Sequence, residues 1–358
     1  MAFTAGELDN IANAAIDYHM SRGTVFSSTI QEKPLLHRFR KAQKTFAGGK
    51  GNITVRVKGT YTTTIQGYTH DDTVTYANPA NIKTASFPWK EIHSGIEVTH
   101  TELKHDGITV VDDSEGKTAE KSGREMQMLA NLLEDKLEDM TEGTNRGVNL
   151  MWWRDGTADA KLVAGVKSII VDDPTTATTI GGIDQSVETW WQNRSLVDNS
   201  GGAGTDDRIV ANNANKADQV LINTLNTEYR QLVRYGGRPD LWLAGSDFLD
   251  QMERELREKG VYTQTGWANQ GMIDVKMADS GLNGMGILYD PTLDDEGEAK
   301  RCYAIDTKNI CPMVMVGEDL RRRSPVRPYD KYAIYRAFTW TGALIARQRN
   351  SSGVYEIA

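Results

Sequence analysis

Four pairs of adjacent aspartates are the most conspicuous candidates for chemistry in this sequence. They are Asp112-Asp113, Asp172-Asp173, Asp206-Asp207 and Asp294-Asp295. Two carboxylates that flank a sugar can hydrolyse its glycosidic bond, and the pairs Trp152-Trp153 and Trp190-Trp191 could stack on such a sugar. A carbohydrate-active hydrolase is therefore one hypothesis. The competing interpretation is structural, because all four pairs lie in turn-like contexts where aspartate is expected anyway. We favour that interpretation and expect no catalytic residue.

The glycine-rich segments give little support for nucleotide binding. GGKGN at 48–52 lacks the Ser or Thr after its Lys, and the preceding spacing, that a phosphate loop requires. GLNGMG at 281–286 has its glycines in the wrong order for a dinucleotide site, and no predicted helix follows it. Ser246 sits at a predicted strand-to-helix turn, but fits a helix N-cap better than a nucleophile. The sequence therefore predicts no cofactor.

The histidines and cysteines do not form a metal-binding pattern. His100 and His105 are five residues apart, so they share neither a helix face nor a strand face. The sequence contains no HExxH motif and no cysteine pair at zinc spacing. Cys302 and Cys311 are interpreted as small buried hydrophobic residues. We expect no metal site, no disulfide framework and a reducing compartment.

One dense basic run, RRRSPVRP at 321–328, remains to be explained. Arg321, Arg322 and Arg323 could contact nucleic-acid phosphates. They could equally form salt bridges across a subunit contact, since arginine suits desolvated ion pairs. The chain carries a net charge of −8 and a pI near 5.4, which argues against a dedicated nucleic-acid binder. The charge balance favours the subunit contact.

The elements that would position these residues begin with an amphipathic helix. Thr4 and Glu7 form a capping box, and Gly23 is a plausible stop. The segment has no basic n-region followed by an apolar run, so it is not a signal peptide. No apolar run approaches the ~18 residues that a membrane span requires. The following stretch, 27–52, reads as an irregular basic arm with no pattern that could bury itself.

A long hairpin is predicted between Ile53 and Glu91. Apolar and polar residues alternate from Ile53 to Lys58, and eight threonines lie between Thr54 and Thr75. Strands of about 20 residues would extend roughly 60 Å at ~3.3 Å per residue. With so little apolar surface such an arm must lie on another surface, and a neighbouring chain is the expected one. Pro88 would mark an edge or a bend.

The strongest predicted helix runs from about Thr118 to Thr144, with apolar residues at steps of three and four. The stretch AGVKSIIVDDPTTATTIGGIDQS at 164–186 reads as β-rich. The centre of the chain then reads as an α/β unit, with helices at about 214–235 and 246–259 and a strand at PDLWLAG.

The terminal segment DKYAIYRAFTWTGALIAR reads as a long, half-buried strand. Its large apolar residues fall on even positions, including Phe338 and Trp340, and a bend is expected near Gly342. We expect that large face to pack against Leu133 and Leu137 of the long helix.

The order of these parts resembles the major capsid (head) proteins of tailed bacteriophages, the Caudoviricetes, which have the Hong Kong 97-type α+β fold. Five segments carry the resemblance in the same order: FPWKEIHSGIEVTHTEL, GGIDQSVETWWQN, PDLWLAGSDFLDQM, GILYDPTLD and PYDKYAIYRAFTWTGALIARQRNSSGVYEI. The likeness covers nearly the whole chain.

The resemblance implies five regions. They are an N-terminal arm at 1–47, an extended hairpin loop (E-loop) at 48–92, a peripheral domain at 93–183 with a spine helix at about 118–144, an axial α/β domain at 184–298, and a return to the peripheral domain at 299–358. Contacts between subunits would involve Lys50, Arg56, Lys58, Tyr61 and the three arginines at 321–323.

The implied function is structural. Hexamers and pentamers would form an icosahedral virion shell around double-stranded DNA, with assembly in the host bacterial cytoplasm. The arm begins within a few residues of Met1, so a separate scaffolding protein is expected. A portal protein, a decorating (cementing) protein and non-specific contacts with packaged DNA complete the expected partners, with no membrane. Some relatives cross-link a hairpin lysine to an asparagine; here Lys50 or Lys58 with Asn309 or Asn350 is conceivable, but no motif distinguishes them.

Three alternatives remain open from the sequence. An encapsulin-like nanocompartment shell has the same fold but encloses enzymes instead of DNA. A tail or baseplate component is also β-rich and oligomeric. The hydrolase hypothesis belongs to a different class.

Overall fold

The computed structural model describes residues 2–4, 31–61, 63–76, 81–105, 109–111, 123–210, 220–258, 281–282, 285–323 and 333–358. These residues form helices and several β-sheets, so the predicted mixed α+β class is confirmed. The chain divides into two compact units. The first comprises Met1–Gln31, Glu91–Val148 and Met315–Thr341, and the second comprises Glu32–Lys90, Asn149–Val314 and Gly342–Ala358. The predicted N-terminal helix at 4–23 lies outside the described residues.

A six-stranded sheet forms the centre of the second unit. Its strand order is β11 (Gly281–Leu282), β12 (Met285–Tyr289), β10 (Leu241–Ala244), β13 (Arg301–Ile305), β17 (Gly353–Glu356) and β9 (Arg194–Leu196). β10 runs parallel to β12 and antiparallel to β13, and β17 runs antiparallel to β13 and parallel to β9. Neighbouring strands therefore come from distant parts of the sequence.

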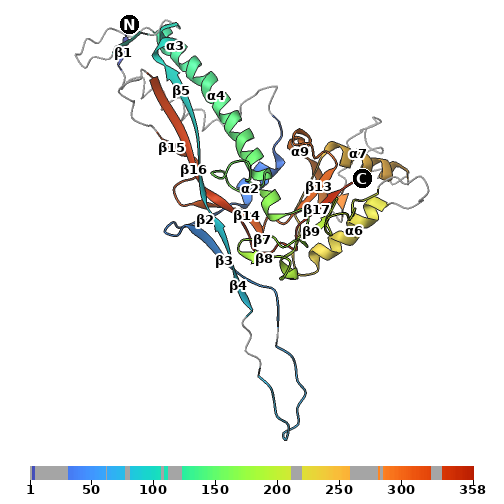
Figure 1. Ribbon diagram of the computed structural model, residues 1–358. Helices are drawn as coiled ribbons and strands as arrows, with labels where there is room; N and C mark the ends of the chain where they lie inside the picture. Colours follow the sequence, from blue (N-terminus) through green and yellow to red (C-terminus); the bar gives the residue numbers. More distant parts are fainter. Residues whose placement is uncertain are drawn as a thin grey trace, which may run out of the picture. The chain divides into compact units, whose positions relative to one another are not determined.

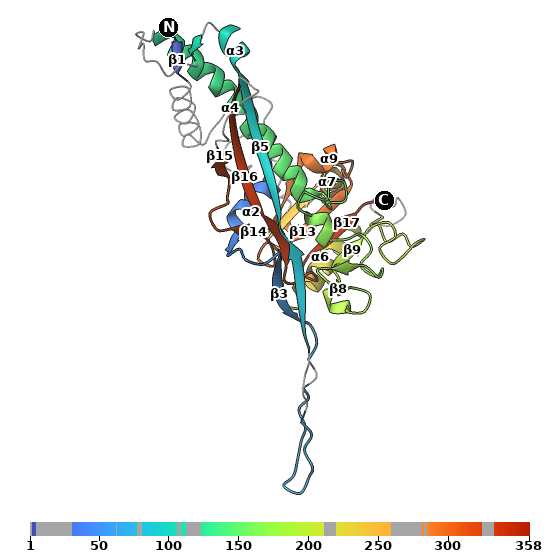
Figure 2. The same cartoon turned by 60° about the vertical axis from the view of Figure 1, so that its left-hand side comes forward.

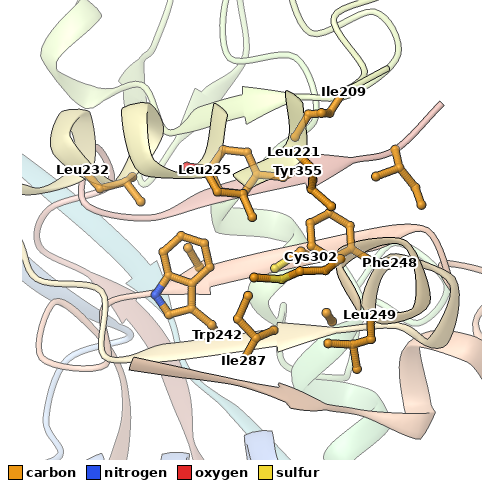
Figure 3. Packing of buried hydrophobic residues seen from close by; sticks show 14 residues of the cluster. Ile209, Leu221, Leu225, Leu232, Trp242, Phe248, Leu249, Ile287, Cys302 and Tyr355 are labelled. Carbon is orange, nitrogen blue, oxygen red and sulfur yellow. The ribbon is translucent and has the colours of Figure 1, made fainter. Parts of the chain in front are cut away.

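Two helices, α6 (Val220–Val233) and α7 (Ser246–Glu258), pack on one face of this sheet (Figure 3). The buried cluster between them includes Leu221, Leu225, Leu232, Phe248, Leu249, Met252, Trp242, Cys302 and Tyr355. The register pairs Trp242 with Ala304 and Cys302 with Tyr355, which places these side chains on the same face. The rings of Trp242 and Tyr355 stack with their centroids 6.1 Å apart. Cys302 and Cys311 are both buried, as predicted, and both have free thiols.

The opposite face of the sheet carries the last turn of α4 (Gly123–Trp153) (Figure 1). Trp153 lies with its ring centroid 5.0 Å from that of Tyr303, a residue of β13 that alternates with the cluster on the other face. Its Nε1 donates to Asp290 Oδ2 over 3.0 Å. Asp290 also caps the short helix α9 (Pro291–Asp295) by accepting from the amide of Thr292. Burial at this place raises the pKa of Asp290. Both faces of the sheet are therefore covered.

The basic segment before the hairpin folds differently from the prediction. Residues Pro34–Ala42 form a helix, α2, with Pro34 at its start and Leu35, Leu36 and Phe39 buried. Phe39 meets Trp152 edge-on with ring centroids 5.6 Å apart, and Arg38 forms an ion pair with Asp240. The three buried residues at 35, 36 and 39 lie on one face of the helix, but three positions are too few to reveal a helical period in the sequence. At least this part of the predicted arm at 1–47 is packed against its own subunit.

The last long strand, β16 (Ala333–Ala346), belongs partly to each unit. In the second unit it pairs antiparallel with β14 (Ile310–Met315), and β14 in turn pairs with β2 (Lys44–Phe46). Residues 340–346 are all buried, odd and even positions alike. The prediction of a half-buried strand is therefore wrong for this half, because the strand is covered on both faces. β16 continues as one strand through Gly342, and the bend expected there stays a prediction.

The first unit contains most of α4, together with β5 (Lys90–Thr99) and the first half of β16. Met140 of α4 is buried against Ile96 of β5 and Phe338 of β16, and Ser94 and Thr144 share a 2.5 Å hydrogen bond. Shorter elements complete it: β1 (Ala2–Thr4) pairs with β6 (Thr109–Val111), α3 (His100–His105) follows β5, and β15 (Arg321–Arg323) pairs with β16.

Phe338 of the terminal strand packs against Met140 of the long helix, and Trp340 is buried. The expected contacts with Leu133 and Leu137 stay a prediction. The side chains of Leu133 and Leu137 lie outside the described residues.

Two further sequence predictions need correction. The long helix does not end near Thr144 but continues to Trp153, because Asn149 and Trp153 find buried partners in the second unit. The stretch at 164–186, expected to be β-rich, is mostly turns with a short helix α5 (Val166–Ile169) and two-residue strands β7 (Thr179–Ile180) and β8 (Ile183–Asp184). Thr175 and Thr176 form hydrogen bonds with Asp173 instead of joining a β-sheet. No helix among the described residues is long and apolar enough for a membrane span.

Candidate assembly surface

The predicted hairpin is regular only at its base. β3 (Asn52–Lys58) and β4 (Ile82–Pro88) pair antiparallel over seven residues each (Figure 2). Their register places Ile53 opposite Phe87 and Val55 opposite Ala85, so the odd positions share one face. Phe87 and Ala85 are buried there, as is Val57. The strands are thus much shorter than the roughly 20 residues predicted.

The buried face of the base packs on the turn between β7 and β8. The amide of Ser86 donates to the carbonyl of Gly181 over 2.8 Å. A Cβ added at Gly181 would lie 3.0 Å from Cζ of Phe87, and its φ of +61° is a conformation that favours glycine. The base of the hairpin is therefore attached to its own subunit by close packing at a glycine turn.

Beyond the base, the hairpin has almost no packing of its own. Residues 60, 61 and 63–76 are all exposed and form no strand. Side chains replace part of the missing ladder: Gln66 Oε1 accepts from the amide of Thr75, and Gln66 Nε2 donates to the carbonyl of Thr73. At the tip, Asp72 accepts from the amide of Thr69 over 2.8 Å, which lowers the pKa of Asp72. These bonds hold the two arms together without burying any side chain.

Large apolar side chains are exposed along this segment and at the start of β4. Their exposed fractions are 77% for Tyr61, 104% for Ile65, 65% for Tyr68, 37% for Val74, 93% for Tyr76 and 55% for Ile82. Burying one such side chain contributes about 1.5–3 kcal/mol. Several large exposed apolar side chains within one segment are typical of an interaction surface. Nothing in the described part of the subunit covers them.

Positive charge lies next to two of these apolar side chains, Tyr61 and Ile82, at the base of the hairpin. Arg56 and Lys58 lie at even positions of β3, opposite Thr84 and Ile82, and point away from the buried face. Lys58 Nζ lies 4.7 Å from the ring centroid of Tyr61. Lys50 is exposed, and its carbonyl accepts from Trp89 Nε1 over 2.7 Å. The four predicted contact candidates on the hairpin are therefore accessible.

The sequence pattern drew attention to the charged residues and to Tyr61 but missed Ile65, Tyr68 and Tyr76. Together with Tyr61, these three are the most exposed large apolar residues of the distal segment. The sequence does contain a signal for these residues. Large apolar residues recur there among threonines, in a segment with too little apolar surface to form a core of its own.

The other predicted contact candidates lie on β15. Arg321, Arg322 and Arg323 are all exposed. Arg321 and Arg323 both pair with Glu318 of the same chain, at 2.5 and 2.7 Å, and these hydrogen bonds and charges lower the pKa of Glu318. Part of the positive charge of this run is therefore compensated within the subunit. The remainder of the run, 324–328, lies outside the described residues.

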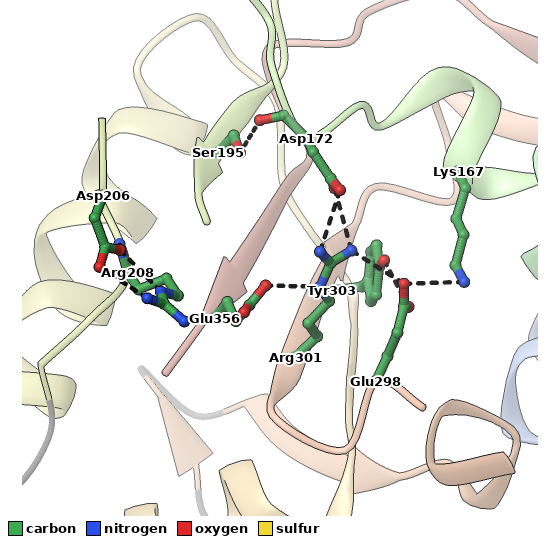
Figure 4. A network of polar contacts seen from close by, with 9 residues as sticks. All are labelled: Lys167, Asp172, Ser195, Asp206, Arg208, Glu298, Arg301, Tyr303 and Glu356. Carbon is green, nitrogen blue, oxygen red and sulfur yellow. Dashed lines mark hydrogen bonds and ion pairs between the residues drawn. The ribbon is translucent and has the colours of Figure 1, made fainter. Parts of the chain in front are cut away.

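The aspartate pairs within the described residues have structural roles. Asp172 binds Arg301, which also contacts Glu298 and Glu356 (Figure 4). Asp206 binds the guanidinium of Arg208, which lowers the pKa of Asp206 to about 2.

Asp294 accepts from the hydroxyl of Tyr289 over 2.7 Å and helps raise the pKa of Tyr289 to about 12. These carboxylates are held by local partners, and Asp112-Asp113 lie outside the described residues.

The tryptophan pairs do not offer platforms for a sugar. Trp152, Trp153 and Trp191 are 3%, 0% and 0% exposed. Trp190 is half-buried against Gly59. A glycosidase needs its carboxylates and stacking rings to converge on one accessible place, and the described residues provide no such place. No group of His, Cys, Asp or Glu suited to a metal gathers among the described residues either.

Comparison with known proteins gives a likeness at the level of fold. No family model matches the sequence, and no curated protein does. The capsid asymmetric unit of cyanophage A-1(L) has a TM-score of 0.59 at 15% identity, covering 93% of this chain and 94% of that one.

A structure from Mycobacterium phage Bobi has a TM-score of 0.50 at 11% identity, covering 94% and 95%. The capsid of a native GTA particle has a TM-score of 0.50 at 13% identity, covering 96% and 98%. The chain therefore has the fold of phage capsid subunits over nearly its whole length.

Proposed function

We propose that this chain is the major capsid protein of a tailed bacteriophage, a structural protein without catalytic activity. Many copies assemble as hexamers and pentamers into an icosahedral shell that encloses double-stranded DNA. The observation that supports this most strongly is the fold likeness to the cyanophage A-1(L) capsid over 93% of the chain at a TM-score of 0.59.

The hairpin supports an assembling role independently of that likeness. Its distal residues expose Tyr61, Ile65 and Tyr76 almost completely. An isolated two-stranded hairpin is only marginally stable in water. We therefore expect this hairpin to become stable where it lies on another surface. A second copy of the same chain is the partner we propose, with Arg56 and Lys58 facing acidic groups there.

The regions follow the Hong Kong 97-type plan in this proposal. The extended loop is 48–92, the peripheral domain comprises 93–183 and 299–358, and the axial domain is 184–298. Within this plan α4 is the spine helix, with its described residues at Gly123–Trp153. Arg321, Arg322 and Arg323 on β15 form a second contact with a neighbouring subunit.

The proposed partners follow from the shell. A scaffolding protein guides assembly, a portal protein occupies one vertex, and a decorating protein can bind outside. The acidic net charge of −8 limits adhesion to DNA, so contacts with packaged DNA are weak and independent of sequence.

Electron microscopy of the purified, concentrated protein tests the proposal. We expect capsomers or closed shells, from this protein alone or together with a scaffolding protein. A chain that stays monomeric under both conditions contradicts the proposal. Shells that form in the expressing cell and contain a specific enzyme in place of DNA would instead identify a nanocompartment.

A further inference from the structure

The point where the hairpin leaves the subunit is occupied by a tryptophan. Gly59 directly follows β3, and the indole of Trp190, in the 3-10 helix η1 (Thr189–Trp191), lies against it. A Cβ added at Gly59 would fall 1.8 Å from Cδ2 and 2.2 Å from Cγ of Trp190. No side chain fits there, so the contact requires glycine at this position.

Glu188 holds the tryptophan and the second strand of the hairpin together. Trp190 Nε1 donates to Glu188 Oε2 over 2.5 Å. The other carboxylate oxygen, Oε1, lies 3.2 Å from Nζ of Lys83. Lys83 is the register partner of Val57, two residues before Gly59. One carboxylate thus connects the ring that touches the first strand to a charge on the second.

The same segment is anchored in the core on its other side. Trp191 is fully buried, and its Nε1 donates to the carbonyl of Ile180 over 3.0 Å. Arg349, also fully buried, donates to the carbonyls of Trp191 and Ile169 and to the side chains of Gln185 and Asn193. Its guanidinium lies 5.8 Å from the centroid of the Trp191 ring. Trp190 is therefore mounted on a rigid part of the second unit.

We infer that Trp190 is a positioning residue, which sets the direction in which the distal hairpin leaves the subunit before any neighbour binds. The distal segment has no packing of its own to set this direction. From Gly59 to the tip is roughly 36 Å at ~3.3 Å per residue, so a 10° change at Gly59 displaces the tip by about 6 Å.

The importance of this direction for a shell rests on the proposed function, whereas the contact itself does not. The test therefore uses the isolated subunit. Spin labels are attached at His70→Cys on the tip and Asp159→Cys, both exposed positions of the second unit. The native Cys302 and Cys311 are 0% exposed and do not react.

The matched variants are Gly59→Ala and Gly51→Ala. Gly51 lies just before β3, and a Cβ added there meets nothing within 4 Å. We expect Gly59→Ala to shift or broaden the distribution of distances between the labels by about 6 Å or more. Gly51→Ala should leave the distribution unchanged. Trp190→Ala should act like Gly59→Ala, while Trp190→Phe, which retains a ring over Gly59, should restore most of the original distribution.

Distance distributions that are the same in Gly59→Ala, Trp190→Ala and the unsubstituted chain overturn the inference. Thermal unfolding of each variant checks that the subunit is folded. If Gly59→Ala does not fold, Trp190→Ala and Glu188→Ala test the same contact, because they remove the tryptophan ring or the carboxylate that holds it. A chain that shows the expected shifts but forms no shells contradicts the proposed function and leaves the positioning role supported.

Discussion

The central sheet and the distal hairpin of the second unit make opposite use of the same kinds of residue. Leu225 and Tyr355 in the cluster on the sheet are 0% exposed, whereas Ile65 and Tyr76 on the hairpin are 104% and 93% exposed. The first pair stabilises the subunit by leaving water when the chain folds. The second pair can do so only when another surface covers it. Folding and association are therefore assigned to separate groups of apolar residues, and mutations can separate the two.

Removal of the distal hairpin should have the largest effect on assembly. Residues 61–80 are replaced by a short Gly-Ser linker between Thr60 and Asn81, which already approach closely through a 2.8 Å hydrogen bond. We expect the free energy of unfolding to stay within about 1 kcal/mol of the original, because the described part of the excised segment is exposed. Shells should be absent in electron micrographs. Normal shells from the shortened chain would show that the hairpin is not an assembly element.

A matched pair of aliphatic truncations should distinguish the two regions next. Leu225→Ala should lower the free energy of unfolding by about 2–5 kcal/mol, because it leaves a cavity in the buried cluster. Ile65→Ala should change it by less than about 0.5 kcal/mol. Denaturant titration measures both. We expect Ile65→Ala to raise the protein concentration needed for assembly, and equal stability losses in the two variants would contradict the comparison.

Replacement of the buried Arg349, which holds the segment around Trp191, should have the third largest effect. Arg349→Met removes donors to two carbonyls and two side chains and leaves these acceptors buried. We expect a loss of about 3 kcal/mol in the free energy of unfolding. Arg347→Met, at an exposed position of the same segment, serves as the control and should be nearly neutral. Arg349→Lys should not rescue the loss, since one ammonium cannot reproduce the planar fork.

Two buried tyrosines should respond in opposite directions. The hydroxyl of Tyr355 has no hydrogen-bond partner among the described residues. Tyr355→Phe should therefore leave stability unchanged or raise the free energy of unfolding by up to about 1 kcal/mol. Tyr303 donates to Glu298 Oε2 over 3.0 Å, so Tyr303→Phe should lower it by a similar amount. A loss in Tyr355→Phe as large as that in Tyr303→Phe would indicate a bound water at Tyr355.

The effect of acid on the hairpin tip should be the smallest of these effects. The amide and hydroxyl of Thr69 donate to Asp72 and lower the pKa of Asp72. A lowered pKa means that the turn is stabilised above the ordinary range of aspartate, near 3.9, and that this is lost as the pH falls through the lowered pKa. Amide exchange at Thr69 should accelerate below that point. Asp72→Asn should remove the pH dependence, and its persistence would assign it to another group.

Local patterns in the sequence predicted the elements that depend on neighbouring residues. The strand at Leu241–Ala244, the helix at Ser246–Glu258 and the alternation of β3 follow from periodicity over a few residues. The structural interpretation of Asp172, Asp206 and Asp294 followed from the preference of aspartate for turns. None of these conclusions required knowledge of distant contacts.

Predictions failed where a distant partner decided the outcome. The helix α2 was predicted as an unpacked arm, because nothing near Phe39 in the sequence announces Trp152 as its partner. The last turn of α4 exists because Asp290, 137 residues away, accepts from Trp153. Ile65 and Tyr76 are visible in the sequence as large apolar residues among threonines, but their exposure was not predicted, because exposure is a property of the folded chain.

The sequence by itself determined the mixed α+β class, the alternation that makes β3 and β4 a hairpin, and the order of parts that resembles phage capsid proteins. Each of these is written in short-range periodicity or in the linear order of elements. The tertiary structure alone decided where the regular hairpin stops and what fixes its exit. Gly59 and Trp190 are 131 residues apart, and only close packing brings an indole onto a position that has room for no side chain.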